Sequence, residues 1–171
     1  MMERANSQAR LLDKLCSDIK PGVVDWIGLR SERKGLVHSV ASCEAIEGLG
    51  LQGDHRVLKS PGSARQVTII SREFILAVQH QMGMDFIDPA WLRRNILISG
   101  MNLNILRYQR LQIGNVILET SALAHPCSRM DEALGKGGAA AMFGYGGLCA
   151  KVIQGGKIAV GDSVVRLPIE R

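Results

Sequence analysis

The sequence predicts a mostly β protein, a closed or partly closed β-barrel with helical inserts. Short apolar and β-branched segments recur between residues 22 and 167, and glycine-rich turns separate them. These strands do not alternate with long helices, which excludes a doubly wound sheet. With 171 residues, 46% of them hydrophobic and 22% charged, the chain has the composition of an ordinary globular domain. We expect a helical extension over residues 1–21 and one barrel domain over residues 22–171.

The N-terminal third begins with a polar helix and continues with extended segments. Residues 3–19 have the spacing of a short amphipathic helix with one apolar stripe, formed by Leu11, Leu12, Leu15 and Ile19. Residues 23–29 form the first strand candidate. After the charged turn RSERKG, residues 36–46 form the second extended segment.

Residues 48–53, GLGLQG, predict a tight bend where two backbones come close together. No G-K-[ST] follows, so this stretch is not a P-loop. Asp54 is placed to anchor the bend by accepting backbone hydrogen bonds. His55 is a candidate for proton transfer, although a histidine on a loop is more often a surface residue.

Residues 65–98 predict a strand, a helix, a short helix and another strand. Residues 65–70 alternate like a strand, and Ser71 caps a helix that ends at Gly83. Asp88 precedes Pro89, the typical start of a short helix. This helix leads to Arg93, Arg94 and Asn95 at the entrance of the strand 96–98, a set suited to recognising anions and amides.

The second half predicts short strands with glycine turns. Residues 111–113 and 116–120 flank Gly114 and Asn115, which indicates a hairpin. Residues 149–154 and 157–160 flank Gly155 and Gly156, which predicts a second hairpin. A last strand covers residues 163–167.

Cys127 lies between a strand and a predicted helix start. Ser128 and Asp131 have the S-x-x-D spacing in which a hydroxyl and a carboxylate cap the first helical turn. Free amides at a helix N-terminus stabilise a thiolate, the form that attacks electrophiles, carries sulfur or binds a soft metal. A small buried residue in a turn explains the same pattern. The four cysteines are scattered, and we expect free thiols in a reducing compartment.

The net charge of +5 is concentrated in one segment. Residues 56–110 contain eight basic and three acidic residues, so this segment carries the whole excess. An anionic partner or a merely solvated surface explains it equally well. Nucleic acid is disfavoured, because basic runs are short and aromatic residues are few. With no apolar stretch that could span a bilayer and no signal core, we expect a cytoplasmic protein without a membrane partner.

Taken in order, several short motifs resemble the MOSC domain, the family named after the C-terminal domain of molybdenum cofactor sulfurases. The matching residues are 50–54 (GLQGD), 66–68 (QVT) with Glu73, 94–96 (RNI) with Gly100, Asn102 and Leu103, 111–114 (LQIG), Pro126 and Cys127, Gly147, 152–158 (VIQGGKI), and Gly161 and Asp162. The resemblance covers about residues 22–167, and the small size is similar to that of the stand-alone bacterial members.

The resemblance implies a barrel similar to that of pyruvate kinase and a role with the molybdenum cofactor (Mo-molybdopterin). In such families the cysteine matching Cys127 is the molybdenum ligand or the sulfur carrier. Phosphate or pterin contacts would come from Arg65, Arg93 and Arg94, with Thr68 and Asn95 as hydrogen-bonding partners. His125 and Arg129 flank Cys127 and would steer protons or an anionic substrate. Cys127-Ser-Arg is similar to the metal-binding motif of the amidoxime-reducing members, which carry a second cysteine at the position of Met130.

Three functions stay open. The first is a molybdenum-dependent reductase of N-hydroxylated compounds, in which Cys127 binds the metal and His125 donates protons; it needs redox partner proteins. The second is a sulfur carrier that holds a persulfide on Cys127 and delivers it to metal–sulfur centres. The third is a binding module for an anionic ligand. The sequence does not determine the oligomeric state or the substrate.

Overall fold

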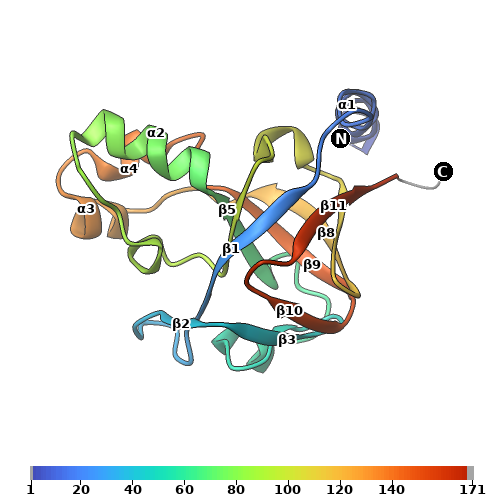
Figure 1. Ribbon diagram of the computed structural model, residues 1–171, viewed down its shortest axis with the longest axis horizontal. Helices are drawn as coiled ribbons and strands as arrows, with labels where there is room; N and C mark the ends of the chain where they lie inside the picture. Colours follow the sequence, from blue (N-terminus) through green and yellow to red (C-terminus); the bar gives the residue numbers. More distant parts are fainter. Residues whose placement is uncertain (1, 169–171) are drawn as a thin grey trace.

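The computed structural model describes residues 2–168, with side chains described from residue 7 onward. The helices are α1 (Met2–Leu15), η1 (His55–Leu58), α2 (Arg72–Met82), η2 (Pro89–Leu92), η3 (Leu103–Leu106), α3 (Arg129–Leu134) and α4 (Gly138–Met142). The strands are β1 (Gly22–Leu29), β2 (His38–Val40), β3 (Ser42–Ile46), β4 (Gly50–Leu51), β5 (Val67–Ser71), β6 (Ile96–Ser99), β7 (Arg110–Ile113), β8 (Val116–Leu123), β9 (Leu148–Gln154), β10 (Gly156–Ala159) and β11 (Ser163–Leu167). Figure 1 shows the helices α2, α3 and α4 together on one side of the strands.

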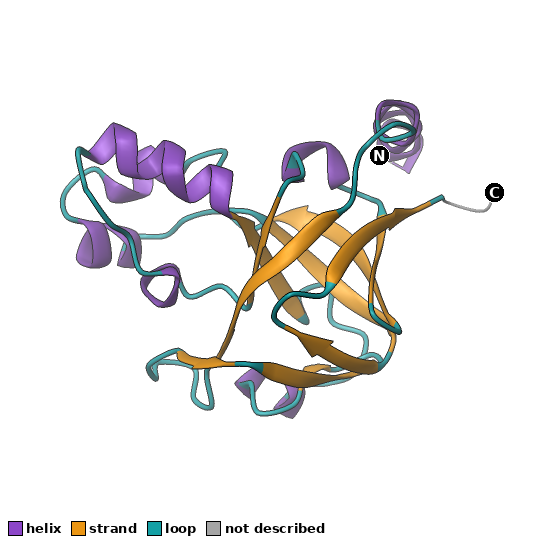
Figure 2. Ribbon diagram, in the orientation of Figure 1, coloured by secondary structure: helices purple, strands orange, loops and turns teal. Residues whose placement is uncertain are grey.

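Within the described residues, seven strands close into a barrel in the order β11-β7-β8-β9-β5-β6-β1, which confirms the predicted fold class (Figure 2). The ring closes where Gly22 and Val23 of β1 pair antiparallel with Val164 and Ser163 of β11. Strands β5 and β6 are parallel, because α2 connects them as a crossover. Closure leaves no free edge in the ring, and β2 continues the sheet from the far end of β1.

A second, smaller sheet has the order β10-β3-β4. The sequence predicts a hairpin across Gly155 and Gly156, and the structure contradicts it. Strand β9 pairs with β5 and β8, whereas β10 pairs antiparallel with β3, so that Lys157 lies opposite Glu44. The glycine pair therefore carries the chain from one sheet to the other.

Burial differs between strands with one face on the core and strands covered on both faces. On β8 buried and half-buried residues alternate over Val116–Thr120, as expected for a strand with one face on the core. Every residue of β5 is buried, because this strand lies between the barrel interior and the helices. Helix α2 begins at the predicted cap, where Ser71 Oγ accepts from the Phe74 N–H, and it ends at Gly83 in the left-handed conformation (φ 62°). The local signals for this helix are therefore confirmed.

The N-terminal helix forms over Met2–Leu15, but only part of its predicted apolar stripe packs: Ile19, beyond the helix end, lies against the core, whereas Leu11 and Leu15 do not. Leu11 is 56% exposed and Leu15 is 55% exposed. Two further contacts join this segment to the body: Cys16 is buried and donates its S–H to the Ile105 carbonyl (3.1 Å), and Asp13 forms an ion pair with Arg166. Among residues 2–168, no helix has the length and apolar character that a membrane span requires.

Candidate functional site

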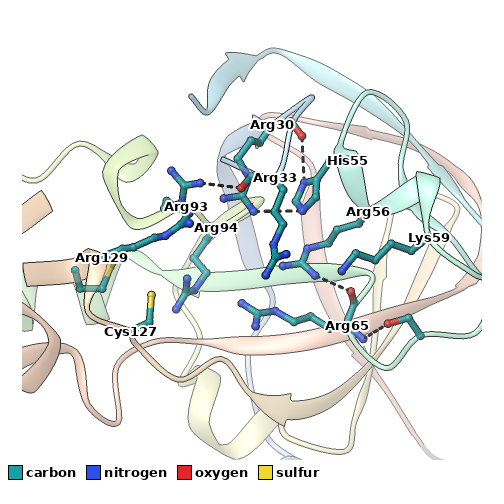
Figure 3. Close-up of a pocket in the computed structure, with 12 residues that line it drawn as sticks. Arg30, Arg33, His55, Arg56, Lys59, Arg65, Arg93, Arg94, Cys127 and Arg129 are labelled. Atoms are coloured by element: carbon teal, nitrogen blue, oxygen red, sulfur yellow. Dashed lines mark hydrogen bonds between the residues drawn. The ribbon is translucent and has the colours of Figure 1, made fainter. Parts of the chain in front are cut away.

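A pocket of about 420 Å³ opens at the end of the barrel that carries Cys127. Its lining consists of seven arginines, one lysine and four other residues: Arg30, Arg33, Arg56, Lys59, Arg65, Arg93, Arg94, Arg129, His55, Ser63, Cys127 and Met130. Among the residues that the structure describes, no carboxylate belongs to this lining. We refer to this cavity as the basic pocket (Figure 3). Eight cations make it a site for an anion, and the Asp54 carboxylate, which acts on Arg30 and Arg56, lies outside the lining.

Loops at the strand ends supply the pocket residues. Arg30 follows β1, Arg65 precedes β5, and Arg56 lies on η1. Arg93 follows η2, and Arg129 is the first residue of α3. Figure 3 draws Cys127 and Arg129 at one end of the pocket and Arg56 and Lys59 toward the other, with the Arg65 side chain extending from that end toward the middle. A ligand that fills the pocket would therefore meet the thiol at one end and cations at the other.

Asp54 organises the wall made by Arg30, His55 and Arg56. Its Oδ2 accepts from the Arg30 backbone N–H (3.1 Å) and from Asn95 Nδ2 (3.0 Å). Its Oδ1 accepts from the Arg56 backbone N–H (3.1 Å) and lies 3.2 Å from His55 Nδ1. The carboxylate is only 3% exposed. The predicted anchoring role of Asp54 is therefore confirmed. Its hydrogen bonds also fix the backbone of Arg30 and Arg56, which line the pocket.

Asn95 and Thr68 do not line the basic pocket. Asn95 donates a hydrogen bond to Asp54, and Thr68 donates to the Asn95 side chain. Asn95 Oδ1 accepts from the Thr68 backbone N–H (3.0 Å) and from Thr68 Oγ1 (3.1 Å). Asn95 Nδ2 donates to the Gly28 carbonyl (3.1 Å) as well as to Asp54. Both side chains are nearly fully buried, and their hydrogen bonds go to the protein. They act as positioning residues here, and the structure does not place them as cofactor contacts.

His55 and Arg30 form a linked pair beside Asp54. His55 Nδ1 lies 3.3 Å from the Arg30 carbonyl, and Nε2 lies 3.4 Å from Arg30 Nη2. The neutral tautomer with a proton on Nδ1 satisfies both contacts. Burial lowers the pKa of His55; the Asp54 carboxylate opposes this shift. Burial and the charge of Arg93 lower the pKa of Arg30 to about 10, so the guanidinium stays cationic at neutral pH.

Arg94 is a buried cation that holds the chain next to Cys127. Its Nε donates to the Gly146 carbonyl (2.8 Å), and its Nη2 donates to the Ala124 carbonyl (3.2 Å). Nη1 donates to the Leu92 carbonyl (3.0 Å). Burial lowers the pKa of Arg94 to about 10, and three carbonyls take the place of an acidic partner. Arg94 thus fixes the segment that leads to Cys127, in addition to lining the pocket.

Cys127 is exposed and opens onto the basic pocket. The predicted cap is wrong: Ser128 makes no side-chain hydrogen bond to the helix, and Asp131 Oδ1 accepts from the Ala139 N–H instead (2.9 Å). Helix α3 has only six residues. The positive environment of the thiol comes from guanidinium groups, because Arg93, Arg94 and Arg129 line the pocket onto which Cys127 opens.

The structure reverses the predicted environments of two histidines, His125 and His55. His125 does not line the basic pocket; it is exposed, stacks on Phe143 with ring centroids 6.2 Å apart, and borders a different, very small hollow. His55, interpreted from the sequence mainly as a surface residue, is 9% exposed and lines the basic pocket. Cys149 is buried, as expected for a strand residue, and burial raises its pKa.

The structure brings together Cys127, Arg65, Arg93, Arg94 and Arg129, as the sequence predicts. Four further cations were missed as site residues: Arg30, Arg33, Arg56 and Lys59. The basic excess over residues 56–110 already contained a signal for two of them. The other two belong to the RSERKG turn, which by itself reads as a solvated loop. Arg93 Nη2 donates to the Arg33 carbonyl (3.1 Å), which ties this turn to the pocket.

Comparison with known proteins identifies the family and the fold of this chain. The family model of the MOSC domain matches residues 54–165. Curated proteins give no match. Among solved structures, the YuaD protein from Bacillus subtilis is similar with a TM-score of 0.76 and 19% identity, over 88% of this chain and 98% of that chain.

Two structures of YiiM show the same fold. YiiM from Escherichia coli has a TM-score of 0.65 and 18% identity, over 85% of this chain and 69% of that chain. YiiM from Geobacillus stearothermophilus has a TM-score of 0.68 and 15% identity, over 85% and 75%. At these identities the likeness concerns the fold alone. The family model, by contrast, matches more than half of the sequence, so this chain belongs to the MOSC domain family.

Proposed function

We propose that this protein binds the molybdenum cofactor in the basic pocket, with Cys127 as the molybdenum ligand, and reduces N-hydroxylated compounds. One observation carries the proposal: an exposed thiol opens onto a pocket lined by eight cations and no carboxylate. A thiolate is a soft ligand for molybdenum, and guanidinium groups bind phosphate in bidentate fashion. The family associates this fold with the molybdenum cofactor.

The residues present fit this cofactor by their chemistry. Arg56 and Lys59, at the end of the pocket away from Cys127, would hold the phosphate together with Arg65, whose side chain extends from that end toward the middle. Cys127 would hold the metal, and Arg93 and Arg129 line the same pocket. When bound, the cofactor supplies the two-electron chemistry of the reduction. The balanced reaction is R–NH–OH plus two electrons and two protons to R–NH₂ plus water, with the electrons delivered by a redox partner protein.

The chain itself would bind the anion, orient it and supply protons. Of the two histidines considered, His55 lines the pocket and is neutral at neutral pH, whereas His125 lies outside. The Asp54 carboxylate fixes the ring of His55, so this imidazole can relay a proton without losing its orientation. His55 therefore replaces His125 in our proposal as the group that faces the bound ligand.

The sulfur-carrier alternative uses the same thiol. An exposed cysteine beside guanidinium groups is also suited to hold a persulfide. A carrier, however, has no need of a cavity of about 420 Å³ with cations far from the thiol. The size and charge of the pocket favour the cofactor-binding function.

Protein expressed with molybdate supplies the test. Molybdenum is measured by elemental analysis, and pterin by the fluorescence of its oxidised form. We expect both in the wild type, loss of molybdenum in Cys127→Ser, and loss of pterin in Arg65→Ala. The matched control is Arg110→Ala, an exposed arginine of the same basic segment that lies outside the pocket lining, and it should retain both.

The other outcomes decide between the alternatives. Wild-type protein without molybdenum and pterin overturns the proposal. Metal-free protein with a cyanide-labile sulfur that Cys127→Ser removes establishes the carrier. An anionic ligand that copurifies with the protein and binds Cys127→Ser unchanged indicates a binding module.

A further inference from the structure

Two loops beside the basic pocket carry strongly exposed leucines. Residues 30–37 connect β1 to β2, and residues 54–65 contain η1 and lead to β5. Leu36 is 78% exposed and Leu58 is 83% exposed, more than any other large hydrophobic side chain that the structure describes. We call these two segments the leucine loops. A single exposed leucine needs no explanation, but two on neighbouring loops form an apolar feature of the surface.

The leucine loops are joined to each other at their base. The His55 backbone N–H donates to the Arg30 carbonyl (2.7 Å), and Asp54 Oδ2 accepts from the Arg30 backbone N–H (3.1 Å). Figure 1 shows both loops at the lower edge of the molecule, the light-blue connection before β2 and the teal turn of η1. The two exposed leucines therefore belong to the same end of the protein.

The leucine loops are also basic. Together they contain six cations and two carboxylates: Arg30, Arg33, Lys34, Arg56, Lys59, Arg65, Glu32 and Asp54. Asp54 is buried, so Glu32 is the one acid that these loops expose, whereas four of the cations are exposed. An exposed lysine lies within two residues of each leucine, Lys34 beside Leu36 and Lys59 beside Leu58. Apolar and cationic side chains thus share one surface.

We propose that the leucine loops dock this protein on an anionic lipid bilayer, with Leu36 and Leu58 inserted at the boundary of headgroups and acyl chains. Protruding apolar side chains gain from the acyl region, and lysines and arginines beside them are attracted to anionic headgroups. This inference goes beyond the proposed function and does not depend on it. The expectation of no membrane partner rested on the lack of a spanning segment and a signal core, and docking at a surface needs neither.

The composition of the leucine loops favours a bilayer over an acidic protein. Protein interfaces are anchored mainly by tryptophan, tyrosine and arginine side chains that fill pockets, and leucine and lysine are rarer there. The leucine loops contain no aromatic residue. The exposed aromatic pair of the described chain, Phe86 and Trp91, lies on a different segment, before and within η2. Leucines next to lysines are the combination that an anionic bilayer accommodates on both counts.

Sedimentation with lipid vesicles tests the proposal. We expect the protein to bind vesicles of phosphatidylglycerol and phosphatidylcholine in equal parts much more tightly than vesicles of phosphatidylcholine alone. Raising NaCl from about 0.1 M to about 1 M should weaken the binding, because salt screens the attraction between exposed charges. Leu36→Ser and Leu58→Ser should each weaken it at least about tenfold, since burying one leucine side chain typically contributes at least this factor.

Matched controls separate the leucine loops from the rest of the surface. Leu76→Ser, at a leucine of α2 that is 53% exposed, should bind vesicles like the wild type. Lys34→Gln should weaken binding about fivefold, the contribution of one cation near an anionic membrane, and Lys34 lies outside the lining of the basic pocket. Lys136→Gln, at an exposed lysine between α3 and α4, should have no effect. Circular dichroism checks that each variant is folded.

The remaining outcomes overturn the inference. Binding that neither Leu36→Ser nor Leu58→Ser weakens would show that cations alone hold the headgroups. Protein that ignores the anionic vesicles but binds poly-glutamate indicates an acidic protein as the partner. A dimer in light scattering that Leu58→Ser separates would show that a second copy covers these leucines. Because vesicle binding is measured without reference to molybdenum or pterin, its failure leaves the proposed function standing, and protein without the cofactor leaves this inference standing.

Discussion

Replacing Asp54 by asparagine tests the carboxylate that organises the pocket wall. Each of its two oxygens faces two groups that donate: Oδ2 the Arg30 N–H and Asn95 Nδ2, Oδ1 the Arg56 N–H and His55 Nδ1. Asparagine has almost the same shape but only one accepting oxygen. If that oxygen keeps the helix-capping bond from Arg56, the new NH₂ group points at two donors. Asp54→Asn therefore loses two hydrogen bonds and gains repulsion in a buried place.

The expected loss of stability follows from these contacts. A hydrogen bond to a charged group contributes about 1.5–3 kcal/mol, so two lost bonds predict a decrease of about 3–6 kcal/mol in the free energy of unfolding. This is a large share of the roughly 5–15 kcal/mol that stabilises a domain. Arg30 and Arg56 also lose their common anchor, so affinity for an anion in the basic pocket should fall as well.

Urea denaturation at neutral pH measures the change, with Asp88→Asn as the matched control. Asp88 also caps a short helix, but it accepts only one hydrogen bond, from the Ala90 N–H (2.9 Å). Asparagine caps helices as well as aspartate, so this control should lose less than about 0.5 kcal/mol. If Asp54→Asn loses no more than Asp88→Asn, the assignment of Asp54 as organiser of the wall is wrong.

Three further predictions concern other parts of the molecule. Burial keeps the pKa of His55 below the unfolded value of about 6.5, so its contribution to stability is fully present above about pH 6.5 and is lost as the pH falls toward the folded pKa, where only the unfolded chain binds the proton. Urea titrations across this range should give a weaker pH dependence for His55→Asn, and an equal dependence contradicts the assignment. Gly147→Ala should lower Tm much more than Gly144→Ala: both positions are left-handed, at φ 91° and 81°, but only at Gly147 does a Cβ meet a backbone oxygen, that of Ile69, at 1.9 Å. Equal Tm values would show that the backbone shifts freely there. A thiol reagent should label one cysteine rapidly in the native protein and none in Cys127→Ser, because the other three cysteines are buried; rapid labelling of a second thiol refutes this.

The fold could be predicted to the extent that its signals are local. Ser71 and Gly83 bracket α2 through a hydroxyl cap and a left-handed residue, and both effects act within one helical turn. The hairpin predicted at Gly155–Gly156 was wrong for the same reason. A glycine pair between two strands favours a local hairpin, but β10 pairs with β3, which lies far away in the sequence. Which strand lies next to a glycine turn depends on barrel closure, and local patterns carry no information about it.

The candidate site could be predicted by residue type better than by role. Polar residues of the family motifs were expected to contact the cofactor, yet Thr68 and Asn95 form hydrogen bonds to each other, and Asn95 donates one to Asp54. A buried amide and a ligand-binding amide look the same in a sequence, because the difference lies in what packs above them. Arginine behaves differently: eight cations around one pocket repel one another, and an anion that binds among them relieves this repulsion. The cations of the basic pocket therefore indicate ligand binding more directly than the motif residues do, and Asp54 with Asn95 explains how the barrel holds this wall in place before any ligand arrives.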